Sequence, residues 1–180
     1  MDTLTKKQRA LKREIEAIVH LIDIEFDDVG FIEKERRTPH LQRVKDHLIR
    51  SAVVLDYTLI DEYLDSLIGD YLFGTQKSSA GLWKTKRFRN FNHFILERLS
   101  VSQKLDFAKA IQRGIPRRIE SAIRKIADLR NTLAHSFFPE NRKQNPPLYG
   151  GHSIYTVDGF KLYWEDARRI GRYFHRRLWR

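Results

Sequence analysis

An arginine and a histidine five positions apart are the residues best suited to chemistry in this sequence. They enclose the segment Arg130-Asn131-Thr132-Leu133-Ala134-His135. Arginine is a permanent cation with a planar fork of donors, whereas histidine is the side chain that changes charge near neutral pH. This combination suits proton transfer beside a negatively charged group, as in the cleavage of an RNA phosphodiester.

The composition gives little support to other kinds of catalytic or metal chemistry. The chain has no cysteine, which excludes disulfides and thiolate catalysis, and it has no glycine-rich phosphate loop. His40 and His47 share a predicted helical face, but no carboxylate or cysteine completes a metal site there, so an exposed polar face is the better interpretation. We predict no metal and no cofactor.

Length and charge restrict the class of protein. The 180 residues fit a single domain, in which residues 1–39 form an N-terminal helix and linker and residues 40–180 form the core. Lys and Arg number 34 against 23 for Asp and Glu, which gives a formal charge of +11. Such a charge attracts nucleic acid or an acidic protein. The start of the chain lacks the apolar core of a signal peptide, and no apolar run is long enough for a membrane span, so we expect a soluble, cytoplasmic protein.

Apolar residues recur at helical spacing through most of the chain, and they predict an all-α bundle. The predicted helices cover residues 3–26, 40–73, 88–99, 101–113, 116–137 and 158–178. An irregular insertion rich in proline and glycine precedes the last helix. Residues 154–157 are compatible with a short strand, and Asp158-Gly159 with a hairpin turn. We favour Asp158 as the cap of the last helix, because the apolar residues that follow it fit a period of 3.6.

The helix predicted from residue 40 to 73 is apolar over a wide arc, which indicates a central position in the bundle or a share in a dimer interface. Two carboxylates interrupt its apolar lines. Asp56 continues the line of Ile49, Val53 and Ile60, and Glu62 lies near Leu59. A charge there is costly unless it is paired. Each carboxylate therefore either meets a cation or marks a solvent-facing break in the stripe.

The helix that carries the motif has a polar stripe opposite its isoleucines. Arg124, Asp128, Asn131 and His135 make this stripe, and Arg130 is offset from His135 by roughly 140°. A long side chain at the margin of the apolar face can still swing towards the histidine. The structural alternative is that His135 only complements the helix dipole and that Arg130 and Asn131 brace neighbouring helices.

The segment 129–136 resembles the signature of the HEPN superfamily, in which an arginine is followed by four to six residues and then a histidine, with a polar residue directly after the arginine. Here the gap is four and the polar residue is Asn131. The chain from about 40 to 178 is similar to the mannitol-repressor-like branch of that family. The resemblance implies an up-and-down bundle of four to six helices that dimerises and, in catalytic members, cleaves RNA without a metal.

In this interpretation His135 is the acid or base, Arg130 holds the scissile phosphate, and Asn131 orients the histidine or the RNA. One chain supplies one motif histidine, so a two-fold dimer is expected to supply the second. Family members often carry an acid on the second long helix that contacts the motif. Asp56 and Glu62 are the candidates for this supporting role.

Two basic segments are candidates for binding the RNA. Arg168, Arg172 and Arg176 recur every four residues on the last helix and are expected to neutralise phosphates in series, unless they form only a solvated face. Cations alternate with aromatic residues from residue 83 to 94. That segment resembles a base-stacking surface, but its spacing favours buried packing over stacking.

Three hypotheses for the function remain. The first is a HEPN-type endoribonuclease that acts as a homodimer, as a toxin or antiphage effector restrained by an antitoxin or another regulatory protein. The second is a non-catalytic HEPN dimer that regulates or binds proteins. The third is a basic helical protein that binds nucleic acid and in which Arg130 and His135 are structural. Cleavage that is lost in His135→Ala while binding persists distinguishes the first from the others.

Overall fold

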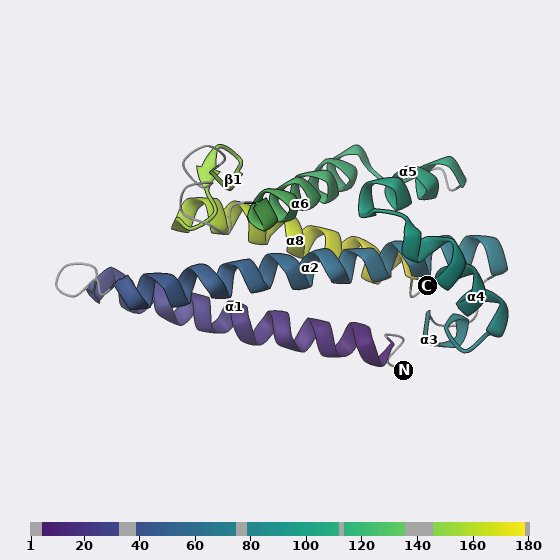
Figure 1. The fold of residues 1–180 in the computed structure, drawn as a ribbon, viewed down its shortest axis with the longest axis horizontal. Helices are drawn as coiled ribbons and strands as arrows, with labels where there is room; N and C mark the ends of the chain where they lie inside the picture. The colour runs from purple at the N-terminus through teal and green to yellow at the C-terminus, as the bar shows by residue number, and fades with distance from the viewer. Residues whose placement is uncertain (1–4, 33–38, 75–78, 112–113, 136–145, 179–180) are drawn as a thin grey trace.

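The computed structural model describes residues 5–32, 39–74, 79–111, 114–135 and 146–178. It is mostly helical, as the sequence predicts, and its long helices pack side by side (Figure 1). Helix α2 (Pro39–Phe73) runs through the middle of the molecule. Helix α1 (Lys6–Ile32) packs antiparallel along one side of it, and α6 (Arg117–His135) and α8 (Val157–Leu178) lie on the other side.

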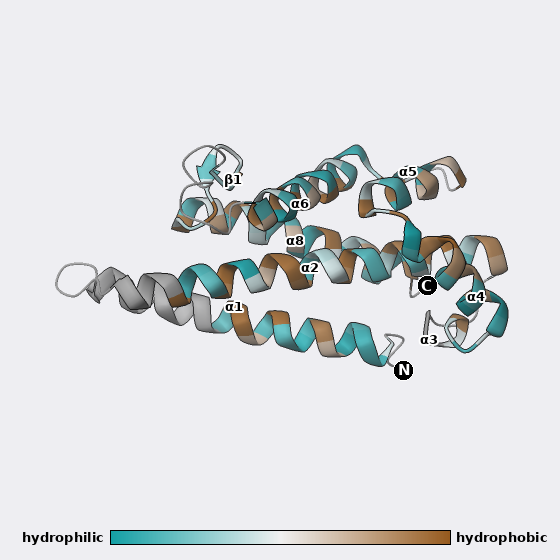
Figure 2. Ribbon diagram, in the orientation of Figure 1, coloured by the Kyte–Doolittle hydropathy of each residue, from teal (hydrophilic) through white to brown (hydrophobic). Residues whose placement is uncertain are grey.

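The central position of α2 explains its wide apolar arc. Ile49, Val53 and Leu64 are fully buried, and Ile60 is nearly so. Apolar residues also follow α2 along much of its length when the ribbon is coloured by hydropathy (Figure 2). The helix begins at Pro39, whose fixed φ suits a first turn. Three of its neighbours, α1, α6 and α8, each cover a part of this arc, so the prediction of a central helix is confirmed.

The N-terminal helix is longer than the sequence predicts. We expected its end near residue 26, because a charged segment follows, whereas α1 continues to Ile32. Charged residues do not end a helix unless proline or a capping sequence stops it. The predicted linker to Pro39 falls on residues 33–38, which lie outside the described part of the chain.

The aromatic segment after α2 forms a small packed layer. It contains α3 (Ser79–Leu82), α4 (Lys86–Phe94), a 3₁₀ turn (Leu96–Arg98) and α5 (Val101–Ile111). Phe88 is completely buried, and its ring meets Trp83 and Phe73 edge to face, with centroid distances of 4.9 and 5.9 Å. The expected packing is therefore observed for Trp83, Phe88 and Phe91, whereas Phe94 is 56% exposed. Phe88 is closed to nucleic-acid bases.

Helices α6 and α8 run antiparallel, so the start of α6 lies beside the end of α8 (Figure 1). The residues predicted to face inward are buried in both helices. In α6 these are Ile119, Ile123, Ile126, Leu129 and Leu133, and in α8 they are Phe160, Tyr163, Ala167, Ile170, Phe174 and Leu178. The predicted end of the motif helix at residue 137 lies outside the described part of the chain.

The insertion before α8 ends in a two-stranded hairpin that the sequence analysis did not predict. Strands β1 (Leu148–Tyr149) and β2 (His152–Ser153) pair antiparallel around Gly150 and Gly151. Both glycines have positive φ, +59° and +86°, as a tight two-residue hairpin turn requires. The strand considered at residues 154–157 is not formed, because the chain turns directly into α8.

The cap of α8 is Thr156, and the prediction of Asp158 is wrong. The backbone N–H of Gly159 donates to Thr156 Oγ1 at 3.3 Å, whereas Asp158 is exposed in the first helical turn. A carboxylate there favours the helix through its dipole without acting as the cap. Gly159 is needed because a Cβ at this position would lie 2.1 Å from the carbonyl oxygen of Ser153.

Within the described residues, no helix combines the length and apolarity needed to cross a membrane.

Candidate active site

The motif lies on the last turns of α6, and its residues divide between two faces of the helix. Leu129 and Leu133 are buried against the core, Arg130 is half-buried, and Asn131 and His135 are exposed. The exposure of Asn131 and His135 agrees with the predicted polar stripe. Arg124, the first member of that stripe, is half-buried and instead belongs to the packing of α5 on α6.

The ion pairs of Arg124 explain why it does not join the motif. Its guanidinium lies 2.5 Å from Asp106 of α5 and 3.2 Å from Glu120, one turn earlier on α6. The two carboxylates raise the pKa of Arg124, although partial desolvation opposes them. This arginine therefore holds two helices together, and its charge is already balanced.

Arg130 is positioned by a tyrosine of α2. Its guanidinium carbon lies 5.2 Å from the centre of the Tyr57 ring, and Arg130 Nη1 donates to Asn131 Oδ1 at 3.3 Å. A guanidinium over an aromatic face is attracted by the ring while its edge remains available for other acceptors. Tyr57 was not foreseen, and its only signal in the sequence was its position beside Asp56 on the same helix.

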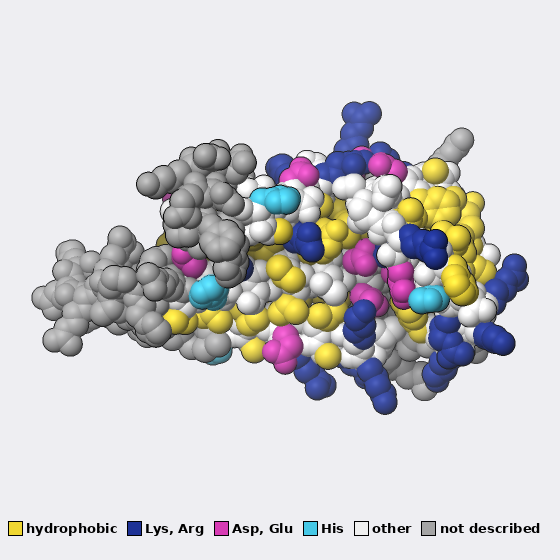
Figure 3. Space-filling model, in the orientation of Figure 1, with side chains coloured by type: hydrophobic (Ala, Val, Ile, Leu, Met, Phe, Trp, Pro, Cys, Tyr) yellow, Lys and Arg dark blue, Asp and Glu magenta, His cyan; other side chains and the backbone are white. Residues whose placement is uncertain are grey.

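The side chain of Arg130 lines a groove between α1, α2 and α6, which we call the motif groove. The groove has a volume of about 600 Å³. The residues that line it are Ile18, His47, Arg50, Ser51, Val54, Leu55, Arg130, Leu133 and Ala134. Hydrophobic side chains form an exposed row along this part of the molecule (Figure 3). His135 is not part of the lining, because it is on the adjacent face of α6.

His47 and Arg50 also lie at this groove, although the sequence indicated His47 only as part of an exposed polar face and did not single out Arg50. His47 is exposed, as predicted, but it lines the same groove as Arg130. Arg50 Nε donates to the hydroxyl of Tyr155 at 2.7 Å, which fixes the guanidinium at the groove. The i, i+3 spacing of a histidine and an arginine on one helix was the available signal. The groove is thus lined by one imidazole and two guanidinium groups, residue types that suit proton transfer and phosphate binding.

Asp56 does not contact Arg130, and neither interpretation of it from the sequence is correct. Its carboxylate is buried, with 7% of the residue exposed, and accepts a hydrogen bond from the hydroxyl of Tyr163 on α8. Burial raises the pKa of Asp56 to about 7, although the bond from Tyr163 opposes the shift. The sequence could not show this partner, because Tyr163 is more than 100 positions away in the chain.

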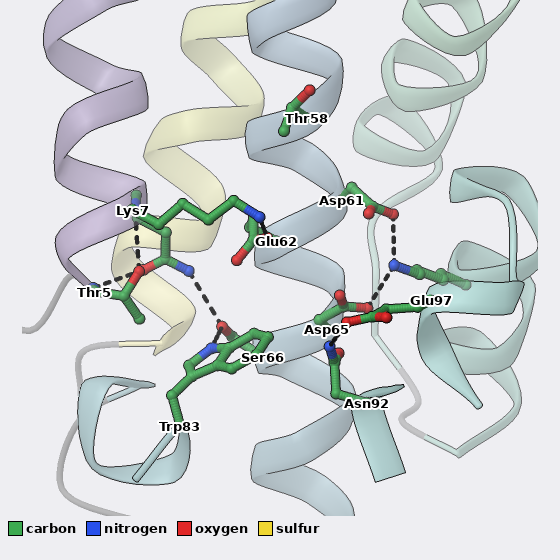
Figure 4. A network of polar contacts seen from close by, with 12 residues as sticks. Thr5, Lys7, Thr58, Asp61, Glu62, Asp65, Ser66, Trp83, Asn92 and Glu97 are labelled. Atoms are coloured by element: carbon green, nitrogen blue, oxygen red, sulfur yellow. Dashed lines mark hydrogen bonds and ion pairs between the residues drawn. The ribbon is translucent and has the colours of Figure 1, made fainter. Parts of the chain in front are cut away.

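Glu62 likewise lies away from the motif. It pairs with Lys7 of α1 at 2.5 Å and belongs to a polar network that fastens α1 and α5 to α2 (Figure 4). In the same network the ammonium of Lys104, almost fully buried, lies 2.7 Å from Asp61 and 2.8 Å from Asp65. These carboxylates are occupied by lysines, and Glu62 has a structural role in the protomer.

No group of three or more histidine, cysteine or carboxylate side chains among the described residues is arranged to hold a metal ion.

The predicted arginine stripe is exposed on α8 and lies at the opposite end of α6 from the motif. Arg172 and Arg176 border a cavity of about 490 Å³ together with Arg118, at the start of α6. Arg118 and Arg130 are twelve residues apart on this helix, which corresponds to about 18 Å. The fold therefore does not bring the stripe and the motif into one site within the protomer.

Comparison with known proteins adds no further constraint. No protein-family profile, curated protein sequence or solved structure matches this chain. The functional assignment therefore depends on the motif and on the geometry described above.

Proposed function

We propose that this protein is a HEPN-type endoribonuclease that cleaves RNA without a metal and acts as a homodimer. One observation carries the proposal. Arg130 is held on Tyr57 at the edge of an open groove and has no carboxylate partner among the described residues. A guanidinium that is fixed but not neutralised is suited to hold a phosphate.

The reaction requires two proton transfers around one phosphate. A base takes the proton of the 2′-hydroxyl, whose oxygen attacks the adjacent phosphorus. The 5′-oxygen then leaves with a proton from an acid, and the products are a 2′,3′-cyclic phosphate and a free 5′-hydroxyl. Arg130 stabilises the negative charge that develops on the phosphate. An imidazole serves as base or acid near neutral pH.

The two imidazoles have two possible origins. In a face-to-face dimer, each protomer contributes one His135, and the second histidine arrives with a second Arg130. Alternatively, His47 of the same protomer supplies the second imidazole, since it lines the motif groove. The first origin is our proposal, because the exposed position of His135 suits a site that the partner completes.

The surface beside the motif suits such a dimer. Val54 is 46% exposed in the groove, and Val44, also on α2, is 41% exposed. Exposed aliphatic side chains of this kind are commonly buried when two protomers associate. The proposed biological role, as a toxin or antiphage effector restrained by a protein partner, follows only from analogy with the family.

The test is an RNA cleavage assay in EDTA with purified protein and single-stranded RNA of mixed sequence. We expect fragments with 2′,3′-cyclic phosphate ends from the wild type and none from His135→Ala. His47→Ala distinguishes the two origins of the second imidazole, because only the single-protomer arrangement requires it. Cleavage that persists in His135→Ala would refute the assignment of this residue.

The regulatory alternative is favoured by a different observation. The motif groove is largely apolar and excludes His135, as expected of a surface that binds a protein segment. If the protein is such a regulatory module, we expect that the wild type does not cleave RNA. We also expect that Val54→Asp disrupts the dimer, as it would in the ribonuclease. Sedimentation equilibrium of the wild type and Val54→Asp, measured beside the cleavage assay, separates the two functions.

A further inference from the structure

Another cavity lies between α1, α2 and α8. We call it the arginine cavity, and its volume is about 400 Å³. It shares no lining residue with the motif groove, but it shares Arg172 and Arg176 with the cavity at Arg118. Its walls are apolar and aromatic. They are formed by Ile15 of α1, Leu59 and Tyr63 of α2, and Trp164 and Ala167 of α8. Tyr63 is only 4% exposed and its ring stacks on Phe174, so the half-buried Trp164 offers the ring on which a flat ligand can stack.

Asp56 supplies a hydrogen-bond acceptor to this cavity. Its carboxylate is more than nine-tenths buried and lines the cavity, and the hydroxyl of Tyr163 donates to Oδ2. Asp56 Oδ1 accepts no hydrogen bond from the described residues. This oxygen is not among the buried polar atoms that lack a partner, so it is accessible from the cavity. A ligand that presents an N–H group there would donate to Oδ1.

The rim of the arginine cavity is cationic. Arg168, Arg172 and Arg176 line it along α8, and none of them has a carboxylate partner among the described residues. Lys12 joins them from α1 and is 3.7 Å from Glu16, the only acidic residue on the described part of the rim. Three arginines without acidic partners around one opening favour a phosphate group.

The wall of the cavity is open at Gly171. This residue lines the cavity, and a Cβ built on it would meet no atom within 4 Å. An alanine at this position therefore displaces no atom, and a leucine extends further into the space of the cavity.

We propose that the arginine cavity binds a nucleoside phosphate, with the base against Trp164, an N–H of the base donating to Asp56, and the phosphate on Arg168, Arg172 and Arg176. The ligand is either a free nucleotide or one nucleotide of a single-stranded RNA, since both present the same chemistry. The proposal does not depend on the proposed ribonuclease activity, because His135 and Arg130 take no part in this site.

The test measures binding to the full-length His135→Ala protein, so that cleavage does not interfere. GMP is titrated by calorimetry, because guanine presents adjacent N–H donors to a carboxylate. A fluorescent 2′-O-methyl RNA of mixed sequence is titrated by anisotropy. We expect Gly171→Leu to weaken binding about tenfold or more, whereas Gly171→Ala, which leaves most of the cavity empty, binds normally.

Arg172→Gln gives an independent check that does not alter the cavity wall. We expect it to weaken binding several-fold, whereas Arg89→Gln, which removes the same charge from an exposed position on α4, has little effect. Circular dichroism melts verify that each variant is folded. Should Gly171→Leu fail to fold, the difference between Arg172→Gln and Arg89→Gln still decides the result.

The outcomes separate the two sources of the ligand. Binding of GMP that Gly171→Leu abolishes identifies a free nucleotide, and an effect confined to the oligonucleotide identifies a nucleotide of an RNA strand. The proposal is overturned if Gly171→Leu binds both probes like the wild type. It is also overturned if inorganic phosphate competes as strongly as GMP, because the base would then make no contribution.

Discussion

The motif groove and the arginine cavity both contain arginines near α2, yet they are built for different tasks. Among the described residues that line the motif groove, Arg130 and Arg50 accompany the imidazole of His47, and none of the lining residues is acidic. In the arginine cavity, the cations surround a buried carboxylate, Asp56, and aromatic walls. The first set suits the proposed proton transfer at a phosphate, whereas the second suits the proposed binding of a base beside a phosphate. The surroundings, more than the number of arginines, decide what each site can do.

The largest effect is expected at the motif. Arg130→Ala and His135→Ala should each reduce RNA cleavage by about 10²-fold or more, the range for loss of a catalytic acid or base or of a stabilising cation. The measurement is the initial rate on a labelled single-stranded RNA in EDTA. Gly171→Leu is the matched control from the other site, and its rate on a dinucleotide substrate should equal that of the wild type. Equal losses in all three variants would contradict a division between the two sites.

The second-largest effect is a dependence of the unfolding free energy on pH, which arises from Asp56 in the arginine cavity. The pKa of Asp56 is raised from 3.8 to about 7 by burial. Between these values the folded protein keeps a proton that the unfolded chain has lost, so the free energy of unfolding falls as the pH rises. One pKa unit corresponds to about 1.4 kcal/mol. We therefore expect that the unfolding free energy of Asp56→Asn, minus that of the wild type, is about 3 kcal/mol larger at pH 8 than at pH 4.

Urea unfolding of both proteins at several pH values measures this effect. The wild type also contains Asp65 and Asp70, whose pKa values are raised by burial to about 7 and about 6. These groups are present in both proteins, so the difference between wild type and Asp56→Asn isolates Asp56. A difference that does not vary with pH would mean that Asp56 titrates alike in the folded and unfolded protein, so that burial does not raise its pKa.

A smaller effect is expected when the hydroxyl that donates a hydrogen bond to Asp56 is removed. Tyr163→Phe removes the donor and leaves a buried carboxyl without a partner, which should cost about 1–3 kcal/mol of unfolding free energy at pH 7. Tyr173→Phe is the control, because its hydroxyl makes a bond of 3.4 Å to the carbonyl of Gly114 in an exposed position. Chemical denaturation compares the two variants. Equal losses would show that Tyr163 contributes mainly through its ring.

The smallest effect concerns the support of Arg130. Tyr57→Leu removes the ring beneath the guanidinium and should lower the cleavage rate several-fold, because a misplaced cation holds the phosphate less well. Tyr57→Phe keeps the ring and should retain the wild-type rate. Initial rates at saturating and limiting RNA test this prediction. If Tyr57→Phe were as impaired as Tyr57→Leu, the hydroxyl and not the ring would be the important group.

Much of the fold was predictable from local patterns. The start of α2 at Pro39 and the buried faces of α6 and α8 agree with the sequence, since helical periodicity and proline act over a few residues. The errors occurred where short-range signals compete. Both Thr156 and Asp158 are good caps, and only the packing of Gly159 against Ser153 decides between them.

The candidate site was predictable only in part. The sequence placed Asn131 and His135 on an exposed face, and it located the exposed arginines of α8. It offered Asp56 as a partner of the motif, did not single out Tyr57, and interpreted His47 only as part of an exposed polar face. Asp56 and Tyr57 take their positions from contacts with other helices, which a local pattern does not show.

The sequence by itself determined the helical class, the amphipathic faces and the residue types that can act on a phosphate. These properties depend on side chains within one or two helical turns. Only the tertiary structure decided that Arg130 lies on Tyr57, that Asp56 is bound by Tyr163, and that the arginines of α8 are at the far end of α6 from the motif. Such pairings depend on how α2, α6 and α8 pack, and packing joins residues that no local pattern connects.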